Sequence, residues 1–596
     1  MLGERGPQHG LFDADHWYGD FVGSGSFYGF LASQRNVLFR DEDFAKLYCR
    51  DNGRPSVPPS LLATALVLQT FQRVSDAEAK QRADYDLRWK VALGIAIDER
   101  PFAKSTLQEF RAQLVLHEEQ RAIFRKSLEL AKGHGYFRGK AKLRVALDTT
   151  NILGRGAVKD TYNLLADGIV QVLRVLAQQA GESLATWAQA ADLVRYVNGK
   201  SLKGQATVTW EDAKERQGFL QGVVEDADRV LGLVRQARVQ HEAGDAEDAA
   251  LAAAAGLLSR LLVQDIERGA DGAVLRDGVA PDRVVSVHDP EMRHGRKSKA
   301  KRFDGHKAQV AVDTESQLIT AVDVLPGNAP DHDQALEMVQ QTEEATDSPV
   351  EETMGDGAYG DGATRQVFVD AGRKLIAKVP GMSNQGRFPK TAFVIDLEAQ
   401  TCTCPAGETT ADLRRDATKG TTTETEGGDQ DQNQEQKRGG TFQFAAVVCV
   451  ACPLLEQCVR GTGGRTVRLH PQEALLQAAR ELQASPEFAE YRQLRQAAEH
   501  RLARLVQLGL RQARYFGRAK TLFQLCMAAT VANLTLLANR AAQSPTEPDF
   551  MPIFVLIRAI TLLTGTEMAL VGRPSSWGSN FAQNRLSLAW TEKRAA

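Results

Sequence analysis

The chain has 596 residues, a formal net charge of −2 and 43% hydrophobic residues, as expected for a soluble protein with several domains. Its seven cysteines, two of them unclustered (Cys49 and Cys526), exclude a secreted disulfide framework. The N-terminus lacks the basic region and apolar core of a signal peptide. The most apolar late segment, residues 551–572, contains Arg558 and Glu567, so we predict a cytoplasmic protein without a membrane span.

The first part of the chain favours helices. After an N-terminal arm (residues 1–37), residues 38–135 carry apolar positions at helical spacing, and Ser105 is the expected N-cap of one helix. The simplest interpretation is a plain helical bundle. The functional interpretation is a DNA-binding domain, because helices with basic residues at their starts can enter the major groove. Lys104 and Arg111 are then the candidate contacts with the DNA backbone.

A short apolar run, KLRVAL (residues 142–147), predicts a buried strand that ends at Asp148. The residues that follow, about 159–279, are mostly helical in periodicity and include an alanine-rich stretch. We therefore expect a long helical insertion that interrupts the sheet to which this strand belongs.

A basic run precedes the next strands. The segments HKAQVAVD and LITAVDVL predict a hairpin with a turn at residues 314–317, and the triplet 331–333 (Asp-His-Asp) most simply caps the following helix. A charge run is usually a solvated loop. This run, however, lies in a chain of near-zero net charge and adjoins an acidic site that we predict around Asp356, as described next. We therefore favour contacts with DNA phosphates. The segment contains a single acid, Asp304. Its seven basic residues are Arg293, Arg296, Lys297, Lys299, Lys301, Arg302 and Lys307.

Asp356 lies in the glycine-rich turn GDGAYGD (residues 355–361). Gly355 and Gly357 permit a sharp turn and the close approach of a bulky polyanion. The turn falls where a short strand would give way to a helix, a place from which a carboxylate can hold a metal ion. Most such aspartates only cap the following helix, so the metal interpretation requires partner acids.

Residues 381–479 contain a cysteine-bearing insertion. The low-complexity residues 408–440 cannot bury a core and predict a mobile loop. Five cysteines flank this loop, and their spacing fits a structural four-cysteine zinc site with Cys402 as the spare thiol; the alternative is a set of reduced or redox-active thiols. The predicted zinc ligands are Cys404, Cys449, Cys452 and Cys458.

Glu499 is the only acid between Arg492 and Lys520, on a periodic helix rich in arginine. Such a glutamate most often forms a salt bridge. Taken with Asp148 and Asp356, however, it completes a set of three hard oxygen ligands, which favours magnesium over zinc.

These motifs, in this order, resemble those of DDE transposases of bacterial insertion sequences, from the group with a helical N-terminal domain and a cysteine-bearing insertion before the catalytic Glu. The resemblance extends over about residues 38–540. It rests on GRPSVPPSLLATALVLQ, STLQEFRAQL, DPEMRHGRKSKAKRFDGHKAQVAVD, GDGAYGD, CPAG with CVACPLLEQC, and ARYFGRAKTLFQ.

The resemblance implies an α/β fold with an RNase H-like catalytic core and a DDE triad of Asp148, Asp356 and Glu499. The family's catalytic helix also carries a Tyr and an Arg before the Glu, which match Tyr491 and Arg495 as DNA contacts; the later basic position falls at Val506, and Glu487 and Glu490 are alternative third ligands. The expected core consists of residues 136–158, 280–380 and 480–545, interrupted by the helical insertion 159–279 and the zinc-binding insertion 381–479 and followed by a tail, 546–596.

The function implied by the resemblance is DNA transposition. Two Mg²⁺ ions held by the triad would support hydrolysis at the ends of the element and joining of the freed 3′-hydroxyl ends to target DNA. The expected partners are double-stranded DNA and a second copy of the chain or more, in the bacterial cytoplasm at the nucleoid. The alternatives are a transposase-derived DNA-binding protein without catalysis and an RNase H-like nuclease without strand transfer.

Overall fold

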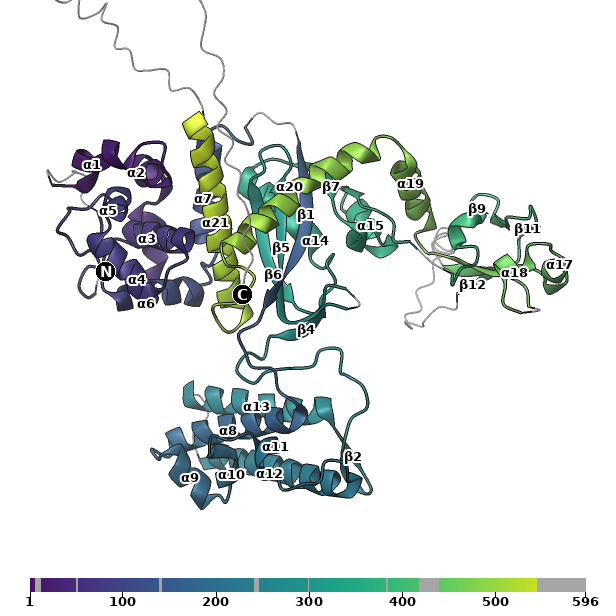
Figure 1. Cartoon of the computed structure of the whole chain (residues 1–596), viewed down its shortest axis with the longest axis horizontal. Coiled ribbons are helices and arrows are strands. Elements are labelled where there is room, and N and C mark those ends of the chain that lie inside the picture. Colours follow the sequence, from purple (N-terminus) through teal and green to yellow (C-terminus); the bar gives the residue numbers. More distant parts are fainter. Residues whose placement is uncertain are drawn as a thin grey trace, which may run out of the picture. The chain divides into compact units, whose positions relative to one another are not determined.

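The computed structural model combines helices with a mixed sheet (Figure 1). It describes residues 1–5, 12–49, 52–138, 142–240, 246–298, 300–381, 384–416, 439–461 and 463–543. Lys299, residues 417–438 of the predicted mobile loop and the predicted tail 546–596 lie outside the described residues.

The N-terminal part is helical, as predicted. Its elements are α1 (Ala14–Val22), α2 (Phe27–Leu38), the 3-10 helix η1 (Asp41–Leu47), α3 (Pro59–Gln72), α4 (Asp76–Tyr85), α5 (Leu87–Leu93), α6 (Lys104–Leu116) and α7 (Ala122–Gly133). Helix α3 is buried on nearly all sides, from Pro59 to Gln69, and forms the centre of this part.

Two predictions for this region are wrong. Residues 1–37 are not an arm, because they contain α1 and α2, and Leu31 of α2 is buried in the same core as α3. Ser105 does not cap α6, which has Ala103 as its N-cap with no side-chain hydrogen bond. The chain between α6 and α7 is a turn in which Glu118 takes a φ of 57°.

The central sheet has the order β4 (Arg293–Arg296), β5 (Arg302–Asp313), β1 (Leu143–Leu153), β7 (Val350–Met354) and β8 (Lys374–Ile376), with β6 (Ile319–Pro326) also paired to β5. Strand β5 is antiparallel to β1, β4 and β6, whereas β1 and β7, and β7 and β8, are parallel. The predicted hairpin is therefore confirmed as β5 and β6.

The sequence predicted that β1 ends at Asp148, but the strand is longer. It continues to Leu153, because its pairing with β5 runs without interruption from Val145 opposite Asp313 to Leu153 opposite Gly305. The end of β1 is held by a later segment: the Leu153 backbone N–H donates to the Arg511 carbonyl at 2.9 Å. Asp148 thus lies inside the strand rather than at its end.

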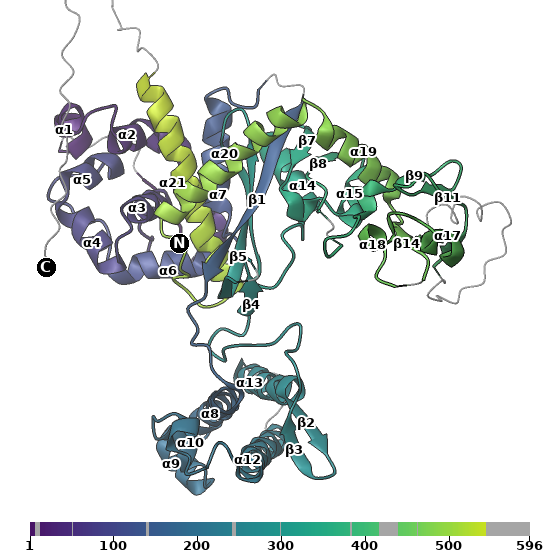
Figure 2. The same ribbon diagram turned by 45° about the vertical axis from the view of Figure 1, so that its right-hand side comes forward.

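Helices pack against this sheet (Figures 1 and 2). They are α14 (Ala335–Thr346), α15 (Gly362–Asp370), α20 (Phe488–Gln507) and α21 (Arg518–Gln543). Helix α20 contacts β1 and β5, and α14 contacts β6.

The side chain of Asn533 on α21 both accepts from the Ile319 N–H and donates to its carbonyl, each at 2.9 Å. By length and composition α21 could cross a membrane, but 78% of its most apolar window is buried, as in a core helix.

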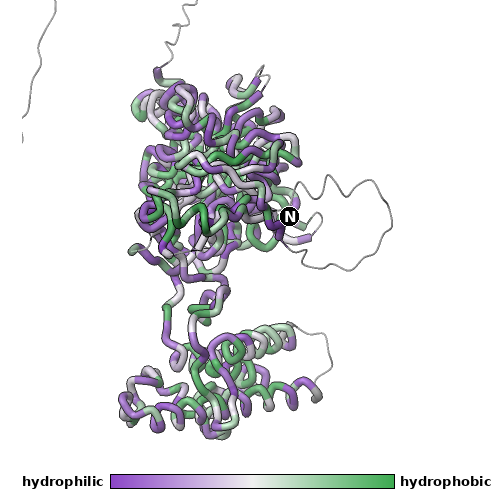
Figure 3. The backbone as a smooth tube through the Cα atoms, turned by 90° about the vertical axis from the view of Figure 1, so that its right-hand side faces the viewer, coloured by the Kyte–Doolittle hydropathy of each residue, from purple (hydrophilic) through white to green (hydrophobic). Residues whose placement is uncertain are grey.

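The helical insertion has a hydrophobic core of its own. Its elements are α8 (Thr161–Gln179), α9 (Leu184–Ala190), α10 (Val194–Val197), α11 (Leu202–Gln205), α12 (Ala213–Gln240), α13 (Ala246–Asp265), β2 (Ile266–Gly269) and β3 (Gly272–Leu275). Ile169, Val223 and Leu258 are fully buried in it, and Figure 3 shows hydrophobic and hydrophilic residues alternating along these helices. It ends in a two-stranded hairpin, where the sequence predicted helix.

The cysteine-bearing region contains short strands and helices. They are η3 (Lys390–Ala392), β9 (Val394–Asp396), β10 (Thr401–Thr403), β11 (Thr409–Thr410), β12 (Leu413–Arg415), β13 (Gly440–Gln443), α17 (Ala446–Val450), α18 (Leu455–Cys458), β14 (Thr466–Leu469) and α19 (Glu473–Ala484). The mobile loop predicted for residues 408–440 therefore begins too early and ends too late. Its first and last residues form β11, β12 and β13, because β12 pairs with β13 across the low-complexity segment.

Candidate catalytic site

The three predicted acids line one cavity of about 650 Å³. Asp148 comes from β1, Asp356 from the turn after β7, and Glu499 from α20. The parallel pairing of β1 with β7 brings together two aspartates that are far apart in the sequence. A fourth acid, Asp331, lines the same cavity.

Asp148 is largely buried, whereas Glu499 is exposed. Its Oδ1 accepts a hydrogen bond from the Thr149 N–H at 2.7 Å, and its side chain is 18% exposed. Burial raises the pKa of Asp148 to about 6, and the charges of Asp356 and Glu499 act in the same direction. The three carboxylates are therefore close enough to influence one another electrostatically.

Asp356 lines the cavity and also stabilises the turn in which it lies. Its Oδ1 accepts from the Ala358 N–H at 2.8 Å and so caps the short helix η2 (Gly357–Tyr359), which is the structural role that the sequence also allowed. Gly355 is required here, because a Cβ at this position would stand 2.6 Å from the Tyr359 ring. The other oxygen of Asp356 is left for a ligand.

Glu499 and Asp148 are joined by one arginine. A terminal nitrogen of Arg495 lies 3.8 Å from Asp148 Oδ2, and the other terminal nitrogen forms a short ion pair with Glu499, one turn further along α20. The salt bridge expected as the simpler interpretation of Glu499 is thus present. It places a positive charge between two of the predicted metal ligands.

The carboxylates surround the cavity rather than converge. Among the described residues, no three His, Cys, Asp or Glu side chains form a group that could hold a metal ion as they stand. Carboxylate oxygens are nevertheless the donors that Mg²⁺ prefers, and the charged guanidinium of Arg495 lies between two of these carboxylates. The donor set therefore fits a divalent metal that displaces the guanidinium.

The alternative third ligands lie elsewhere. Glu487 accepts from the Tyr491 hydroxyl at 2.8 Å, and Glu490 pairs with Arg144 at 3.0 Å; neither lines the cavity. Tyr491 is itself buried, and its hydroxyl also donates to Glu352 at 2.9 Å. Its predicted contact with DNA would require these bonds to break.

The predicted basic contacts fall into two groups. Arg296 and Lys297 are exposed and line the cavity, and Lys301 and Arg302 are exposed beside them. Arg293 is buried, pairs with Asp282 and donates to the Pro290 carbonyl at 2.6 Å. The sequence could not show this, because its partner lies in the preceding loop.

Lys104 is exposed at the start of α6, but Arg111 is not free to contact DNA. Its guanidinium binds Asp76 at 2.7 Å and lies over the Tyr515 ring, 5.8 Å from the centroid. Although burial opposes it, hydrogen bonds from Arg111, Gln69 and Gln108 lower the pKa of Asp76. Arg111 therefore braces α6 against α4 and against the segment after α20.

Several residues of the site were missed or given another role. Lys307, predicted as a DNA contact, is buried and donates to Asp331 Oδ1 at 2.6 Å. Asp331 was expected to cap α14, but the N-cap of that helix is Gln334, and it forms no side-chain bond. Arg511 donates to Thr150 Oγ1 at 3.2 Å and to Asn151 Oδ1 at 2.6 Å, and all three line the cavity.

Four cysteines of the insertion lie near one another, although not as a group that could hold a metal ion as they stand. Burial raises the pKa of the Cys458 thiol, and the thiols of Cys404, Cys449 and Cys452 raise it further. The Arg465 N–H donates to Cys449 Sγ at 3.4 Å, and all four thiols are reduced. Cys402 is instead fully buried in β10, and burial raises its pKa to about 11.

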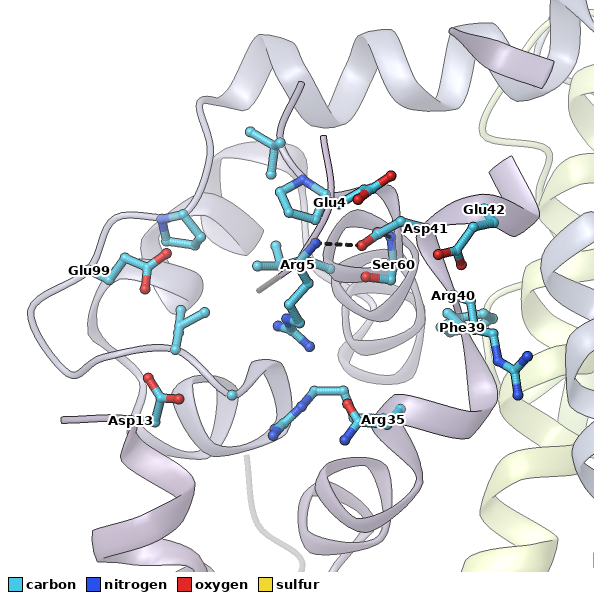
Figure 4. Close-up of a pocket in the computed structure, with 17 residues that line it drawn as sticks. Glu4, Arg5, Asp13, Arg35, Phe39, Arg40, Asp41, Glu42, Ser60 and Glu99 are labelled. Carbon is cyan, nitrogen blue, oxygen red and sulfur yellow. Dashed lines mark hydrogen bonds between the residues drawn. The ribbon is translucent and has the colours of Figure 1, made fainter. Parts of the chain in front are cut away.

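Another cavity, of about 490 Å³, lies within the N-terminal part (Figure 4). Asp41 accepts there from the N–H groups of Arg5 at 2.7 Å and Ser60 at 2.9 Å. Burial, and then the charge of Arg35, lower the pKa of Arg5 to about 10. These internal contacts hold the first residues of the chain against α3.

Two family models match the chain. Residues 403–538 match a transposase DDE domain, and residues 19–113 match a transposase domain, DUF772. The first match contains Glu499 and the second contains Lys104 and Arg111. No curated protein and no solved structure matches the chain.

Matches of this kind are typical of bacterial insertion-sequence transposases, so the resemblance found in the motifs is confirmed. Two segments of the chain are thus similar to transposase domains, and DDE transposases typically use a divalent metal such as Mg²⁺.

Proposed function

We propose that this protein is a DDE transposase that binds the ends of an insertion sequence, hydrolyses phosphodiester bonds there and joins the freed 3′-hydroxyl ends to target DNA. The observation that carries the proposal is the single cavity lined by Asp148, Asp356 and Glu499, three acids from separate elements. Three carboxylates around one cavity repel one another, so their presence there costs stability unless a cation offsets the charge. The matches to transposase domains support the same conclusion.

We also propose that the mixed sheet around β1 is an RNase H-like core. The pairing of β1 with β7, which brings Asp148 beside Asp356, supports this assignment. The core would comprise residues 136–158, 280–380 and 480–545, with the helical and cysteine-bearing insertions between its parts. The separate hydrophobic core of the helical insertion supports its treatment as an added domain.

The roles of the site residues follow from their positions. Asp148, Asp356 and Glu499 would hold two Mg²⁺ ions, which when bound activate water or a 3′-hydroxyl and stabilise the leaving oxygen. The exposed residues Arg296 and Lys297, which line the cavity, would bind the DNA backbone. The same site would serve cleavage and joining, with no covalent protein intermediate.

The cysteine cluster would hold a structural zinc ion. Cys404, Cys449, Cys452 and Cys458 supply four thiols from both sides of the low-complexity segment, and their mutual effect on the Cys458 pKa supports a common site. Burial of Cys402 in a small apolar core, with Ile395 and Phe442, supports its role as the spare thiol. The ion would join the two ends of the insertion.

The partners in this proposal are the two ends of the element, the target DNA and at least one further copy of the chain. Two ends must be joined in one reaction, which a dimer or a larger assembly on DNA can accomplish. Lys104 at the exposed start of α6 would contribute to end binding. The reaction would take place in the bacterial cytoplasm at the nucleoid.

The test is nicking of a labelled duplex that carries the element's own ends, with Mg²⁺. Asp148→Asn, Asp356→Asn and Glu499→Gln should each abolish nicking while end binding persists. Glu490→Gln is the matched control, because Glu490 lies on the same helix and pairs with Arg144 outside the cavity. Binding without nicking by the intact protein would favour a DNA-binding protein without catalysis.

A further inference from the structure

Asp331 lies in the cavity together with the proposed triad, although nothing in the local sequence distinguishes it from a helix cap. It belongs to the loop between β6 and α14, so it reaches the cavity from a fourth chain segment. It does not cap α14, whose N-cap is Gln334. Its carboxylate is therefore available for another role.

Strand β5 holds Asp331 in position. Lys307 donates from Nζ to Asp331 Oδ1 and to the Ala329 carbonyl, both at 2.6 Å. Gln309 donates from its side chain to the Asp331 carbonyl at 3.2 Å. Both the backbone and the side chain of Asp331 are thus fixed by two neighbouring side chains of one strand.

The three aspartates of the cavity share one arrangement. In each, a protein donor holds Oδ1, and no described residue donates a hydrogen bond to the other oxygen, Oδ2. The donors are the Thr149 N–H to Asp148 at 2.7 Å, the Ala358 N–H to Asp356 at 2.8 Å, and Lys307 Nζ to Asp331 at 2.6 Å. Metal-binding carboxylates are held in this way, with one oxygen oriented by the protein and the other directed to the ion.

A buried hydroxyl lies within electrostatic reach of the same three aspartates. Tyr359 is 1% exposed, and its hydroxyl has no hydrogen-bond partner of ordinary geometry among the described residues. Burial raises the pKa of Tyr359, and the charges of Asp148, Asp331 and Asp356 raise it further. The charges of the three aspartates therefore act on one buried group, against the opposing effect of Gln309.

We infer that Asp331 is a fourth carboxylate ligand of the divalent-metal site, oriented by Lys307. The inference rests on the proposed function, because it assigns a further ligand to the same site. Cation binding would draw Asp331, Asp148 and Asp356 closer together than they stand. Two divalent ions carry four positive charges, so a fourth acid also improves the charge balance of the site.

The first test is Mn²⁺ binding by titration calorimetry without DNA, with Asp331→Asn, Asp356→Asn and the control Asp333→Asn. Asp333 is exposed two residues further on and does not line the cavity. We expect Asp331→Asn to weaken binding roughly tenfold or more, and Asp333→Asn to leave it unchanged. If Asp356→Asn weakens binding and Asp331→Asn does not, the inference is wrong and the proposed function stands. If neither weakens it, the proposed metal site is wrong as well.

A second measurement does not depend on the folding of a variant. With added hydrogen peroxide as oxidant and ascorbate to return Fe³⁺ to Fe²⁺, Fe²⁺ bound in place of Mn²⁺ reduces the peroxide to hydroxide and a hydroxyl radical, which cuts the backbone beside the ion. In the intact protein, cuts should occur near residues 148, 331 and 356, and excess Mg²⁺ should suppress all three together. Cuts near 148 and 356 without a cut near 331 would overturn the inference.

Discussion

A terminal nitrogen of Arg495 lies 3.8 Å from Asp148 Oδ2, while the other terminal nitrogen binds Glu499. One guanidinium therefore neutralises two of the proposed ligands at the same time. A metal ion held by these oxygens would compete with Arg495, and a DNA phosphate would be the group to receive the displaced arginine.

The first prediction concerns this competition. Arg495→Met should bind Mn²⁺ several-fold more tightly than the intact protein in the absence of DNA, because the competing charge is gone. The same variant should bind DNA ends more weakly. Calorimetry with Mn²⁺ and a gel-shift titration with labelled ends measure the two effects.

Arg504→Met is the matched control, because Arg504 lies on the same helix, contacts Gln507 at 3.3 Å and does not line the cavity. It should leave Mn²⁺ affinity unchanged. Weaker Mn²⁺ binding by Arg495→Met would contradict the competition and would indicate that Arg495 organises the acids instead.

The second prediction concerns pH. Burial raises the pKa of Asp148 from 3.8 to about 6, so the folded protein favours the protonated acid. The stability that this group contributes is fully present below about pH 4 and is lost as pH rises through about 6. At about pH 8, the loss in the metal-free protein amounts to at most about 3 kcal/mol, from a shift of about two units.

Asp148→Asn should remove this loss. Thermal unfolding without metal should show the variant to be more stable than the intact protein at about pH 8 and equal to it near pH 4. In the intact protein, Mn²⁺ affinity should fall about tenfold per pH unit below about 6, because binding requires the deprotonated acid. A variant that is less stable at about pH 8 would contradict the raised pKa.

The third prediction concerns Asn533, which ties α21 to β6 through both backbone groups of Ile319. Asn533→Ala should lower the free energy of unfolding by about 2–4 kcal/mol, because two buried polar groups lose their partner. Denaturant unfolding measures the effect. Thr535→Ala is the control, since the Thr535 hydroxyl bonds only to carbonyls of its own helix, and it should change stability by less than about 1 kcal/mol.

The fourth prediction concerns the cysteine cluster. The purified protein should contain about one zinc ion per chain by metal analysis, and Cys452→Ser should lose it. Cys49→Ser, at an exposed cysteine outside the cluster, should retain it. After a chelator has removed the zinc, limited proteolysis should cleave the chain first within residues 381–479. A zinc-free protein that resists proteolysis equally would favour reduced structural thiols.

Local patterns in the sequence were sufficient for the hairpin of β5 and β6 and for the turn that presents Asp356, because each depends on neighbouring residues. They were insufficient for β1, whose length is decided by pairing with β5, far along the chain. For the same reason, the place of Asp331 in the cavity could not be predicted. Its local sequence is that of a helix cap, whereas its partner Lys307 is on another element.

The basic run shows that the sequence alone does not reveal which charged side chains are buried. Seven basic residues look alike in sequence, but Arg293 and Lys307 are buried against acids and Arg296 and Lys297 line the cavity. The sequence gives the number of charges, while burial depends on the course of β4 and β5 through the sheet. The three acids proposed as the triad could be singled out in the sequence because they fall in recognisable motifs.

The most direct test of the central claim is joining of precut ends. A labelled duplex with the element's terminal 3′-hydroxyl already exposed is incubated with a target plasmid, Mg²⁺ and either the intact protein or Asp356→Asn. The proposed function predicts that the intact protein links the label to the plasmid and that Asp356→Asn, although it binds the end, does not. Nicking of uncut ends by the intact protein without any joining of precut ends would contradict a transposase and indicate a nuclease.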